Sequence, residues 1–205
     1  MAAAQPAGEK PVLVLNLANP VNPGGGVRRG AHAQEEDLCR KSSLLMSLES
    51  EAAKLYYQYN SSLNTYMGSD AIILNPTVDI IKDENGDLLD QPVTVSVLTS
   101  AAPMISLGLE GMTKGEYYEM FLRRIRVTLQ CAAAWGYKEL VLGAWGCGAF
   151  ANDGREVAGM FAQVLHEMEA AWPFRRVDFA ILSRSGNGNY NIFRRELKDF
   201  LTENV

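Results

Sequence analysis

The sequence is poor in the side chains that bind metals or form disulfides. It contains two histidines, His32 and His166, and three isolated cysteines, Cys39, Cys131 and Cys147. No CxxC, HxxxH or HExxH spacing occurs, which disfavours a structural zinc site and a zincin-type hydrolase. We therefore expect no metal and no other cofactor. Three scattered cysteines also fit a reducing, intracellular compartment, cytoplasmic or nuclear, better than a disulfide-stabilised secreted fold.

Long hydrophobic runs and an excess of positive charge are also missing. No run of about 18 apolar residues could span a bilayer, and the small, polar segment 1–10 lacks a signal-peptide core, so we expect a disordered leader there. Nineteen Lys and Arg against 24 Asp and Glu give a net charge of −5, which argues against general binding of nucleic acid or an anionic membrane. We expect residues 11–205 to form one domain and the chain to be a monomer.

Hydrophobic patterning alternates between strands and helices along the chain. Residues 12–17 are apolar apart from Asn16, as expected for a strand buried on both faces. The same reasoning predicts further strands at 71–74, 93–98, 139–142 and 177–182. Asn85-Gly86, between two apolar pairs, is a hairpin turn signal.

Helices are expected at 35–59, 117–135, 153–171 and 191–201, with Asp153 as an N-cap. A break of the first helix near Ser47 is an alternative. The apolar residues available for the inner face of this helix are Leu38, Leu44, Leu45, Leu48, Ala52 and Leu55. Strands alternating with helices predict a three-layer α/β/α domain around a mixed, mostly parallel sheet.

Two glycine-containing loops follow predicted strands, at residues 21–33 and 143–152. Sheets of this kind bind ligands at the carboxyl ends of their strands, where loops lead into helices. The triglycine 24–26 in the first loop lets backbone N–H groups converge on an anion and a ligand approach closely, although glycine clusters also mark ordinary turns. Neither a GxxxxGK[ST] nor a GxGxxG pattern is present, so a P-loop and a dinucleotide fingerprint are excluded.

Glu35 and Glu36 lie at the end of the first loop, at the start of the predicted helix. Acidic residues in a first turn are favoured by the helix dipole, so the pair could be purely structural. A carboxyl beside a bound anion, however, has its charged form disfavoured. Because a raised pKa is what a general acid needs near neutral pH, the pair is a candidate for acid–base catalysis.

The triglycine 24–26, followed after seven residues by Gln34-Glu35-Glu36, resembles the GGG-X(6–8)-QEE signature of poly(ADP-ribose) glycohydrolases. The segments 14–20, 33–40 and 142–153 are similar to the compact bacterial-type branch of this family. The likeness covers nearly the whole chain from about residue 11. The catalytic domain of the family is a macrodomain, so the resemblance implies a macrodomain fold.

The resemblance also implies an activity and a set of site residues. The chain would cleave ribose–ribose O-glycosidic bonds at the ends of poly(ADP-ribose), releasing ADP-ribose and reversing ADP-ribosylation of proteins, as in the DNA damage response. Glu36 would be the general acid/base, Glu35 would bind ribose hydroxyls, and Asn19 would fix the terminal ribose. The other substrate-binding residues that it implies are Gly24, Gly25, Gly26, Gln34, Gly146, Cys147, Gly148, Ala149 and Phe150.

Several aromatic residues have more than one interpretation. Phe150 would pack either on the ligand or in the core. Trp135 and Trp145 are expected to pack in the protein rather than to stack on a base, because tryptophan is usually largely buried. Either Tyr190 or Phe193, near a polar loop at 183–189, could cover the adenosine.

The remaining reactive side chains are weaker candidates. Cys147 is disfavoured as a nucleophile because the only downstream histidine, His166, lies inside a predicted helix. His32 is expected to be a solvent-exposed loop residue. Arg28 and Arg29 could contact a phosphate of the polymer or only solvent.

Two other functions fit the same fold. One is a non-catalytic ADP-ribose-binding macrodomain, and the other is a hydrolase of mono-ADP-ribosylated protein or of O-acetyl-ADP-ribose. The intact pair of Glu35 and Glu36 favours catalysis over the first, because a binding module needs no acid at the anomeric bond. Nothing outside the motif separates polymer from monomer strongly.

Overall fold

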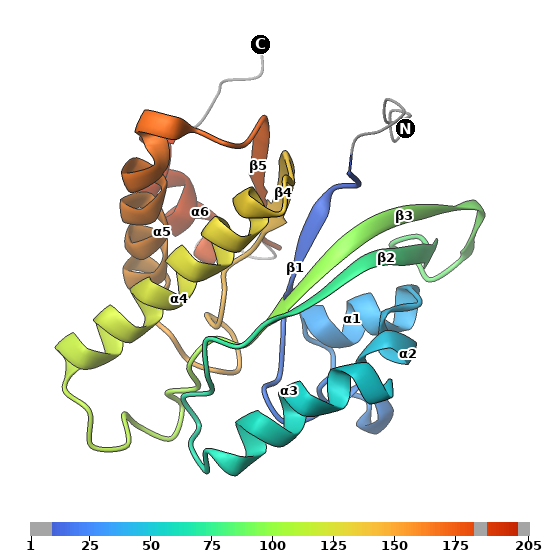
Figure 1. Ribbon diagram of the computed structural model, residues 1–205, viewed down its shortest axis with the longest axis horizontal. Helices are drawn as coiled ribbons and strands as arrows, with labels where there is room; N and C mark the ends of the chain where they lie inside the picture. The colour runs from blue at the N-terminus through green and yellow to red at the C-terminus, as the bar shows by residue number, and fades with distance from the viewer. Residues whose placement is uncertain (1–9, 183–187, 201–205) are drawn as a thin grey trace.

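A computed structural model describes residues 10–182 and 188–200 of the chain. Its centre is a five-stranded sheet with the strand order β2-β3-β1-β4-β5 (Figure 1). Strands β1, β3, β4 and β5 are parallel, and β2 pairs with β3 in antiparallel fashion. The sheet is therefore mixed and mostly parallel, as predicted. The strands are β1 (Leu13–Leu17), β2 (Ile73–Lys82), β3 (Leu88–Ser100), β4 (Glu139–Leu142) and β5 (Arg176–Phe179).

Helices cover both faces of this sheet and complete the three-layer α/β/α macrodomain (Figure 1). One face carries α1 (Gln34–Lys41), α2 (Leu44–Leu48) and α3 (Glu51–Ser62). The other carries α4 (Lys114–Ala134), α5 (Gly154–Met168) and α6 (Asn189–Glu196). Three short 3-10 helices are η1 (Val27–Arg29), η2 (Glu169–Ala171) and η3 (Lys198–Phe200). No helix of the described residues is long and apolar enough to cross a membrane.

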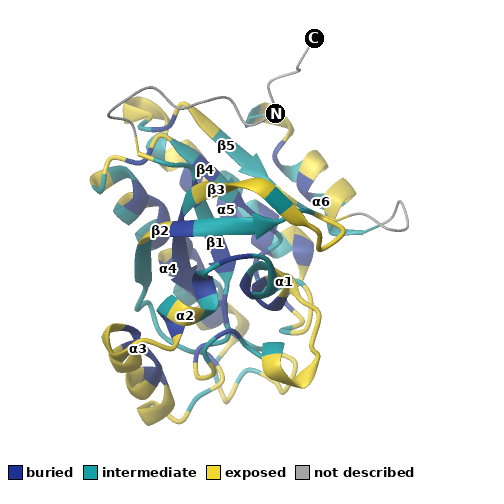
Figure 2. Cartoon of the chain, turned by 90° about the vertical axis from the view of Figure 1, so that its right-hand side faces the viewer, coloured by how far each residue is buried: buried dark blue, intermediate teal, exposed yellow. Residues whose placement is uncertain are grey.

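The central strand β1 contributes side chains to two separate hydrophobic cores, because its side chains alternate between the faces of the sheet. Leu13 and Leu15 are buried in the cluster formed with α4, α5 and α6. Val14 packs against the second cluster, which contains Leu44 of α2 and Val97 of β3. Figure 2 shows this burial along the middle of the sheet, with exposed surface on the outer turns of the helices. The expectation of a strand buried on both faces is confirmed.

The predicted helix 35–59 is in fact three helices. The first break lies at Ser42 and Ser43, because the Ser43 N–H donates to the carbonyl of Asp79 in β2 at 3.0 Å and its hydroxyl accepts the Asp79 N–H at 3.0 Å. The second lies at Glu49 and Ser50, where the Ser50 hydroxyl caps α3. The expected break near Ser47 is thus displaced by a few residues.

These breaks change which residues of α3 face inward. Ala52 and Leu55 were expected on the inner face, but both are exposed, and Leu55 keeps 74% of its surface. Ala53, Tyr56 and Tyr57 are buried in their place. The prediction was wrong because each break resets the helical phase, so a single 3.6-residue period cannot be carried from α1 to α3.

The other expected elements agree with the structure apart from their ends. The hairpin turn at Asn85-Gly86 is confirmed, closed by the Asp83 N–H on the carbonyl of Asp87 at 2.9 Å. Strands β2 and β3 extend well beyond 71–74 and 93–98, whereas β5 ends at Phe179. The N-cap role of Asp153 is confirmed by its bond from the N–H of Arg155 at 2.7 Å. The leader expected at 1–10 falls, up to residue 9, outside the described residues, as do parts of the loop 183–189 and the helix end at 201.

Candidate active site

The loop after β1 folds back onto two buried glutamates at the start of α1. Glu35 is 3% exposed and Glu36 is 7% exposed. Oε1 of Glu36 accepts the N–H of Gly26 at 2.8 Å, and Oε2 accepts the N–H of Ala33 at 2.9 Å. The Glu36 carboxyl therefore links Gly26 to Ala33, the two ends of the second half of this loop. This link holds a glycine-rich segment in one conformation.

Glu35 lies deeper, against the end of β1. Its Oε2 accepts the backbone N–H of Asn19 at 2.7 Å, and its Oε1 accepts the side-chain amide of Asn16 at 3.2 Å. Burial raises the pKa of Glu35 to about 7, because the charged form loses its hydration. The bonds from Asn19 and Asn16 oppose this shift, and the neighbouring Glu36 adds to it. The raised pKa that the sequence suggested for the pair is therefore found on Glu35.

Gly25 is the residue that lets both carboxyls approach the loop. Its backbone has φ +60°, and a Cβ placed there would lie 2.3 Å from Oε1 of Glu36 and 3.0 Å from Oε2 of Glu35. Gly24 is equally restricted, since a Cβ would lie 2.6 Å from Cδ1 of Leu45. The triglycine thus makes room for the catalytic candidates themselves.

The amides of the triglycine are partly used inside the protein. The N–H of Gly25 donates to the carbonyl of Asn22 at 2.9 Å, and that of Gly26 donates to Glu36. These two groups are not free for an anion in this conformation. Contact of the triglycine with substrate stays a prediction, carried by its position beside the carboxyls.

Gln34 and Asn19 hold the loop against the strand that precedes it. The Gln34 side chain accepts the N–H of Leu17 at 2.9 Å and donates to the carbonyl of Leu15 at 2.9 Å, which ties α1 to β1. Oδ1 of Asn19 accepts the N–H groups of Val21 and Asn22 at 3.0 and 2.8 Å. Both residues lie at the predicted site, and their contacts with ligand remain predictions.

Asn16 is a site residue that the sequence reasoning missed. It is fully buried, donates to Glu35 and also to Oγ1 of Thr99 at 3.2 Å, and its own Oδ1 has no partner among the described residues. Asn16 and Thr99 face each other across the parallel pair β1 and β3. The signal was present in the sequence, because Asn16 is the one polar residue in an apolar strand and a buried amide needs partners.

The second glycine loop lies at the same edge of the sheet. It follows β4, the neighbour of β1, and a Cβ on Gly143 would lie 3.3 Å from Cδ1 of Leu17. Gly146 has φ +73°, and a Cβ there would lie 2.3 Å from Nδ2 of Asn152. The structure therefore brings the two loops to neighbouring strand ends, as expected.

Asn152 shapes this second loop from inside. It is buried, donates to the carbonyls of Pro103 and Gly146 at 2.8 and 2.9 Å, and accepts the Tyr117 hydroxyl at 2.7 Å. These bonds hold the loop to the β3–α4 connection and to α4. Asn152 is a second residue that the sequence analysis did not single out.

The outer turn of the second loop offers free donors. Gly148 and Ala149 are exposed, and the N–H groups of Gly148, Ala149 and Phe150 donate to no acceptor within the described part of the chain. The turn leads directly to Asp153 and the N-terminus of α5. Successive free N–H groups beside a helix N-terminus suit an anion such as a diphosphate.

The aromatic candidates separate into core and surface residues. Trp145 is fully buried against Phe121, which confirms its packing role. Phe193 is 2% exposed and packs with the core, so the expectation that it could cover an adenosine was wrong. Tyr190 is 43% exposed and keeps that prediction open, while Phe150 is half-buried against the core.

The structure does not support a catalytic role for the other reactive side chains. Burial, with a smaller contribution from Asp153, raises the pKa of the Cys147 thiol to about 12, so the nucleophilic thiolate is scarce. His166 lies on α5 beside Glu169 and forms no pair with Cys147 among the described contacts. Arg28 pairs with Glu49 at 2.8 Å. His32 is exposed, as expected.

Comparison with known proteins agrees with this geometry. The family model for the microbial-type poly(ADP-ribose) glycohydrolase (PARG) catalytic domain matches residues 1–83. The Deinococcus radiodurans PARG structure in complex with ADP-ribose is 39% identical and superposes with a TM-score of 0.86, over 93% of this chain and 77% of that one. The Thermomonospora curvata PARG bound to the inhibitor ADP-HPD is 36% identical, with a TM-score of 0.83 over 92% and 71% of the two chains. Curated protein sequences gave no match.

Fold and sequence thus agree with the same relatives. The identity exceeds a third, and the likeness extends over nearly the whole of this chain. The buried glutamate pair stands at the carboxyl end of β1, next to the loop that follows β4. The chain therefore belongs to the microbial-type poly(ADP-ribose) glycohydrolases, a family of glycosidases.

Proposed function

We propose that this chain hydrolyses poly(ADP-ribose) at its ends, with Glu36 as general acid/base and Glu35 as its buried partner. The observation that carries the proposal is the pair of carboxyls packed against Gly25. A module that only binds ADP-ribose has no use for two buried acids at the anomeric bond, and keeping them buried costs free energy of folding. Poly(ADP-ribose) is the substrate named by the relatives described above.

The two glutamates differ in a way that suggests their roles. Both oxygens of Glu35 accept bonds from β1 and its connection, so this carboxyl is fixed below the loop. Glu36 is held by the N–H groups of Gly26 and Ala33, in the loop that a ligand must touch. We therefore assign the proton transfer to Glu36 and the binding of ribose hydroxyls to Glu35.

The reaction requires two proton transfers at Glu36, one to the leaving group and one from water. Glu36 donates its proton to the departing 2′-oxygen as the bond to the anomeric carbon breaks and an oxocarbenium-like centre develops. The resulting carboxylate takes a proton from water, whose oxygen bonds to that carbon, and Glu36 is protonated again. Glu35, with a pKa of about 7, is partly protonated near neutral pH, which limits repulsion between the two acids.

The second loop supplies the place for the diphosphate. The free N–H groups of Gly148, Ala149 and Phe150 and the N-terminus of α5 provide donors without any Lys or Arg. Gly146, Cys147 and their neighbours would then enclose the diphosphate, with Phe150 at its side. Local donors of this kind reconcile an anionic ligand with a chain of net charge −5.

The biological setting is proposed in the same way. We propose that residues 11–205 act as one catalytic domain in an intracellular compartment, where the three free cysteines stay reduced. There the enzyme would reverse ADP-ribosylation of proteins, including that made during the DNA damage response.

The test compares wild type with Glu36→Gln on poly(ADP-ribose) and on mono-ADP-ribosylated protein, measuring released ADP-ribose. We expect release from the polymer by wild type and a loss of at least about a hundredfold for Glu36→Gln, because acid–base catalysis contributes about 10²–10⁴-fold. Glu119→Gln, an exposed glutamate of α4, is the matched control and keeps its activity. Full activity of Glu36→Gln would contradict the mechanism. Binding of ADP-ribose without release from either substrate would instead identify a binding module.

A further inference from the structure

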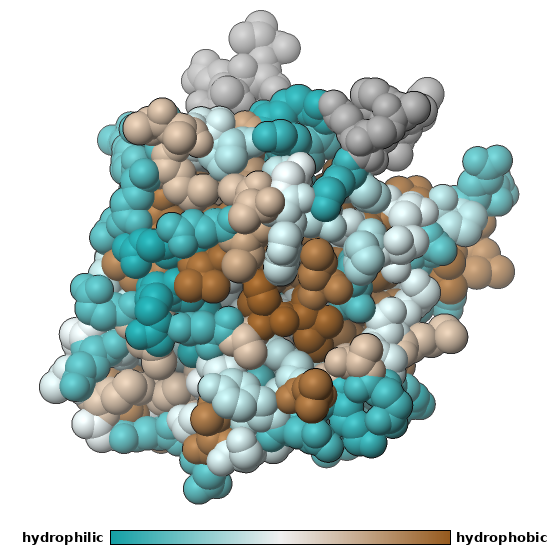
Figure 3. Space-filling view, in the orientation of Figure 1, coloured by the Kyte–Doolittle hydropathy of each residue, from teal (hydrophilic) through white to brown (hydrophobic). Residues whose placement is uncertain are grey.

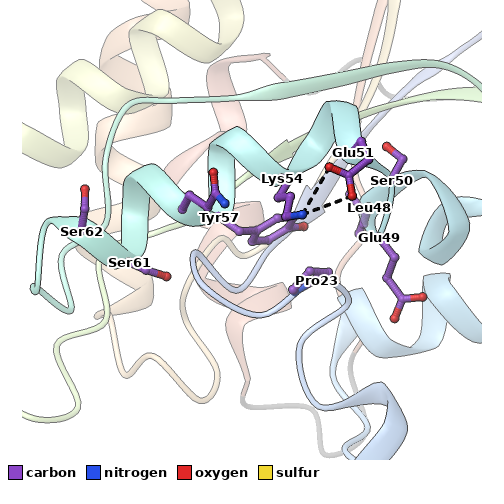
Figure 4. A pocket seen from close by; sticks show the side chains of 10 residues that line it. Pro23, Leu48, Glu49, Ser50, Glu51, Lys54, Tyr57, Ser61 and Ser62 are labelled. Atoms are coloured by element: carbon purple, nitrogen blue, oxygen red, sulfur yellow. Dashed lines mark hydrogen bonds and ion pairs between the residues drawn. The ribbon is translucent and has the colours of Figure 1, made fainter.

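A hollow of about 630 Å³ lies beside the glycine loop, between Pro23 and the helices α2 and α3 (Figure 4). We call it the α3 groove. Ser50, Lys54, Gln58 and Ser61 of α3 and its cap give it hydroxyl, amide and ammonium groups. A volume of this size suits a ligand as large as a nucleotide. Nothing in the reaction at Glu36 and the second loop uses this groove.

The α3 groove is joined to the glutamate pair through its walls. Pro23 directly precedes the triglycine, so one wall is the catalytic loop itself. Tyr57 forms part of another wall, and its buried hydroxyl has no partner among the described residues. Burial, followed by the charge of Glu35, raises the pKa of Tyr57. The α3 groove and the glutamate pair share the glycine loop, since Pro23 lines the groove and Gly25 packs against both carboxyls.

The α3 groove and the second loop lie on opposite sides of the sheet. The second loop leads into α5, which packs with Leu13 and Leu15 on one face, whereas α2 and α3 pack with Val14 and Val97 on the other (Figure 1). A terminal ADP-ribose unit that reaches from Glu36 to the second loop extends toward the α5 side. The opposite side of the glutamate pair, toward α3, then offers a path for the unit across the scissile bond.

We propose that the α3 groove binds the next ADP-ribose unit of the polymer, the one that carries the departing 2′-oxygen. This inference rests on the proposed function, and it assigns a second subsite to the same active site. The occupant is a nucleotide-like unit with ribose hydroxyls, an adenine and a diphosphate. It arrives and leaves as part of the polymer, whereas released ADP-ribose does not reach the groove.

The charges of the α3 groove are compatible with such a ligand. Lys54 pairs with Glu51 at 3.2 Å, but both side chains are more than half exposed, so this pair is weak and the ammonium can turn to a phosphate. Glu49 is held by Arg28, which balances its charge. In Figure 3 the lower part of the molecule, where α3 lies in Figure 1, shows hydrophilic residues beside hydrophobic ones.

Hydrogen-bonding groups are available as well. The side chains of Gln58 and Ser61 form no hydrogen bond with another described residue, and Gln58 is exposed. Being one turn apart on α3, at positions i and i+3, they lie on the same helix face. An amide and a hydroxyl so placed can bind two hydroxyls of one ribose.

The experiment separates the two subsites by comparing polymer with product. Lys54→Glu removes the cation and Ser61→Trp fills the groove. Both changes are on the exposed face of α3, where folding is expected to be kept. We expect each to raise the KM for poly(ADP-ribose) by about three- to tenfold, the size of one lost hydrogen bond. The Kd for ADP-ribose, measured by calorimetry, should stay within about twofold of wild type. Lys138→Glu, at the opposite end of β4, is the charge-matched control.

Each outcome decides the inference. An unchanged KM for the polymer in both variants overturns it. A parallel loss of ADP-ribose affinity also overturns it, because the groove would then hold the terminal unit. If wild type itself releases no ADP-ribose from the polymer, the proposed function fails first and the second subsite fails with it. Activity of wild type with unchanged variants removes only the second subsite.

Discussion

The side-chain amide of Asn16 lies 3.2 Å from Oε1 of Glu35 and 3.2 Å from Oγ1 of Thr99. A strand residue thus connects the deeper acid to the neighbouring strand of the sheet. Because β1 and β3 are paired strands inside the sheet, this contact ties Glu35 to the sheet as well as to the connection after β1. Asn16 is in this sense a positioning residue.

Replacement of Asn16 by Leu should lower turnover more than it changes affinity. The variant keeps a similar volume but loses the bond to Glu35, and we expect a fall in kcat of about tenfold or more. Since the Asn16 bond lowers the pKa of Glu35, its loss should raise that pKa further, as ¹³C NMR of the Glu35 carboxyl can show. Thr99→Ser, which keeps a hydroxyl beside Asn16, is the control and should retain most activity. An unchanged kcat and Glu35 pKa in Asn16→Leu would refute the positioning role.

Gly25→Ala should abolish activity without unfolding the domain. The added Cβ would meet Glu36 at 2.3 Å and Glu35 at 3.0 Å, so one or both carboxyls must move. Gly30→Ala is a matched control in the same loop, because Gly30 has φ +80° but no atom within 4 Å of its Cβ position. Both variants carry the left-handed backbone penalty of about 1–2 kcal/mol. We expect activity to fall at least about a hundredfold in Gly25→Ala alone. Equal activity of the two variants would show that strain and not displacement matters.

In the second glycine loop, the effect of a Gly→Ala substitution on stability should likewise depend on the position that is changed. At Gly146, φ is +73° and a Cβ would lie 2.3 Å from Nδ2 of the buried Asn152, whereas Gly148 has open space at its Cβ position. We expect Gly146→Ala to lower the free energy of unfolding by more than about 2 kcal/mol and Gly148→Ala to change it by less than about 0.5 kcal/mol. Urea unfolding measures both values. Equal stability of the two variants would contradict the packing described for Asn152.

Glu35 should make the stability of the protein depend on pH. Its folded pKa, about 7, lies above the ordinary 4.5, so the folded state binds the proton more tightly than the unfolded state. Stability is therefore fully kept below about pH 4.5 and declines as the pH rises from 4.5 to 7. A shift of this size corresponds to up to about 3 kcal/mol.

Glu35→Gln removes this dependence because glutamine does not titrate. We expect the difference in unfolding free energy between wild type and Glu35→Gln to change by up to about 3 kcal/mol between pH 4.5 and 7.5, in the direction that favours the variant at higher pH. Urea unfolding across this range measures it, with the exposed Glu51→Gln as control. A difference that does not vary with pH would show that Glu35 titrates normally.

The sequence predicted the domain class because local patterns report local burial. The alternation of strands and helices, the cap at Asp153 and the turn at Asn85-Gly86 depend on a few neighbouring residues, and all are present in the structure. The glutamate pair and both glycine loops could likewise be identified from the sequence, because the proposed chemistry requires these residue types at this spacing. The position of both loops at the carboxyl ends of strands followed from the α/β pattern, whereas the pairing of β1 with β4 came from the structure.

What the sequence could not show depends on contacts between distant segments. Ser43 ends a helix only because Asp79, on a strand 36 positions later, offers backbone partners. Leu55 was placed inside because the helical phase was carried through that break. Phe193 was an alternative to Tyr190 for covering the adenosine, because its ring neighbours Phe161 and Phe179 lie in other elements. No local pattern contains these partners.

The sequence by itself determined the fold class, the family likeness and the identity of the two acids, because these follow from residue type, order and spacing. Only the tertiary structure decided how the acids differ. Packing buries Glu35 between Asn16 and Asn19 and raises its pKa, while Glu36 accepts a bond from Gly26 of the glycine loop. It also placed the α3 groove beside Pro23. Burial and hydrogen bonding are properties of the assembled sheet and helices, so two adjacent, chemically identical glutamates acquire separate roles only once the chain has folded.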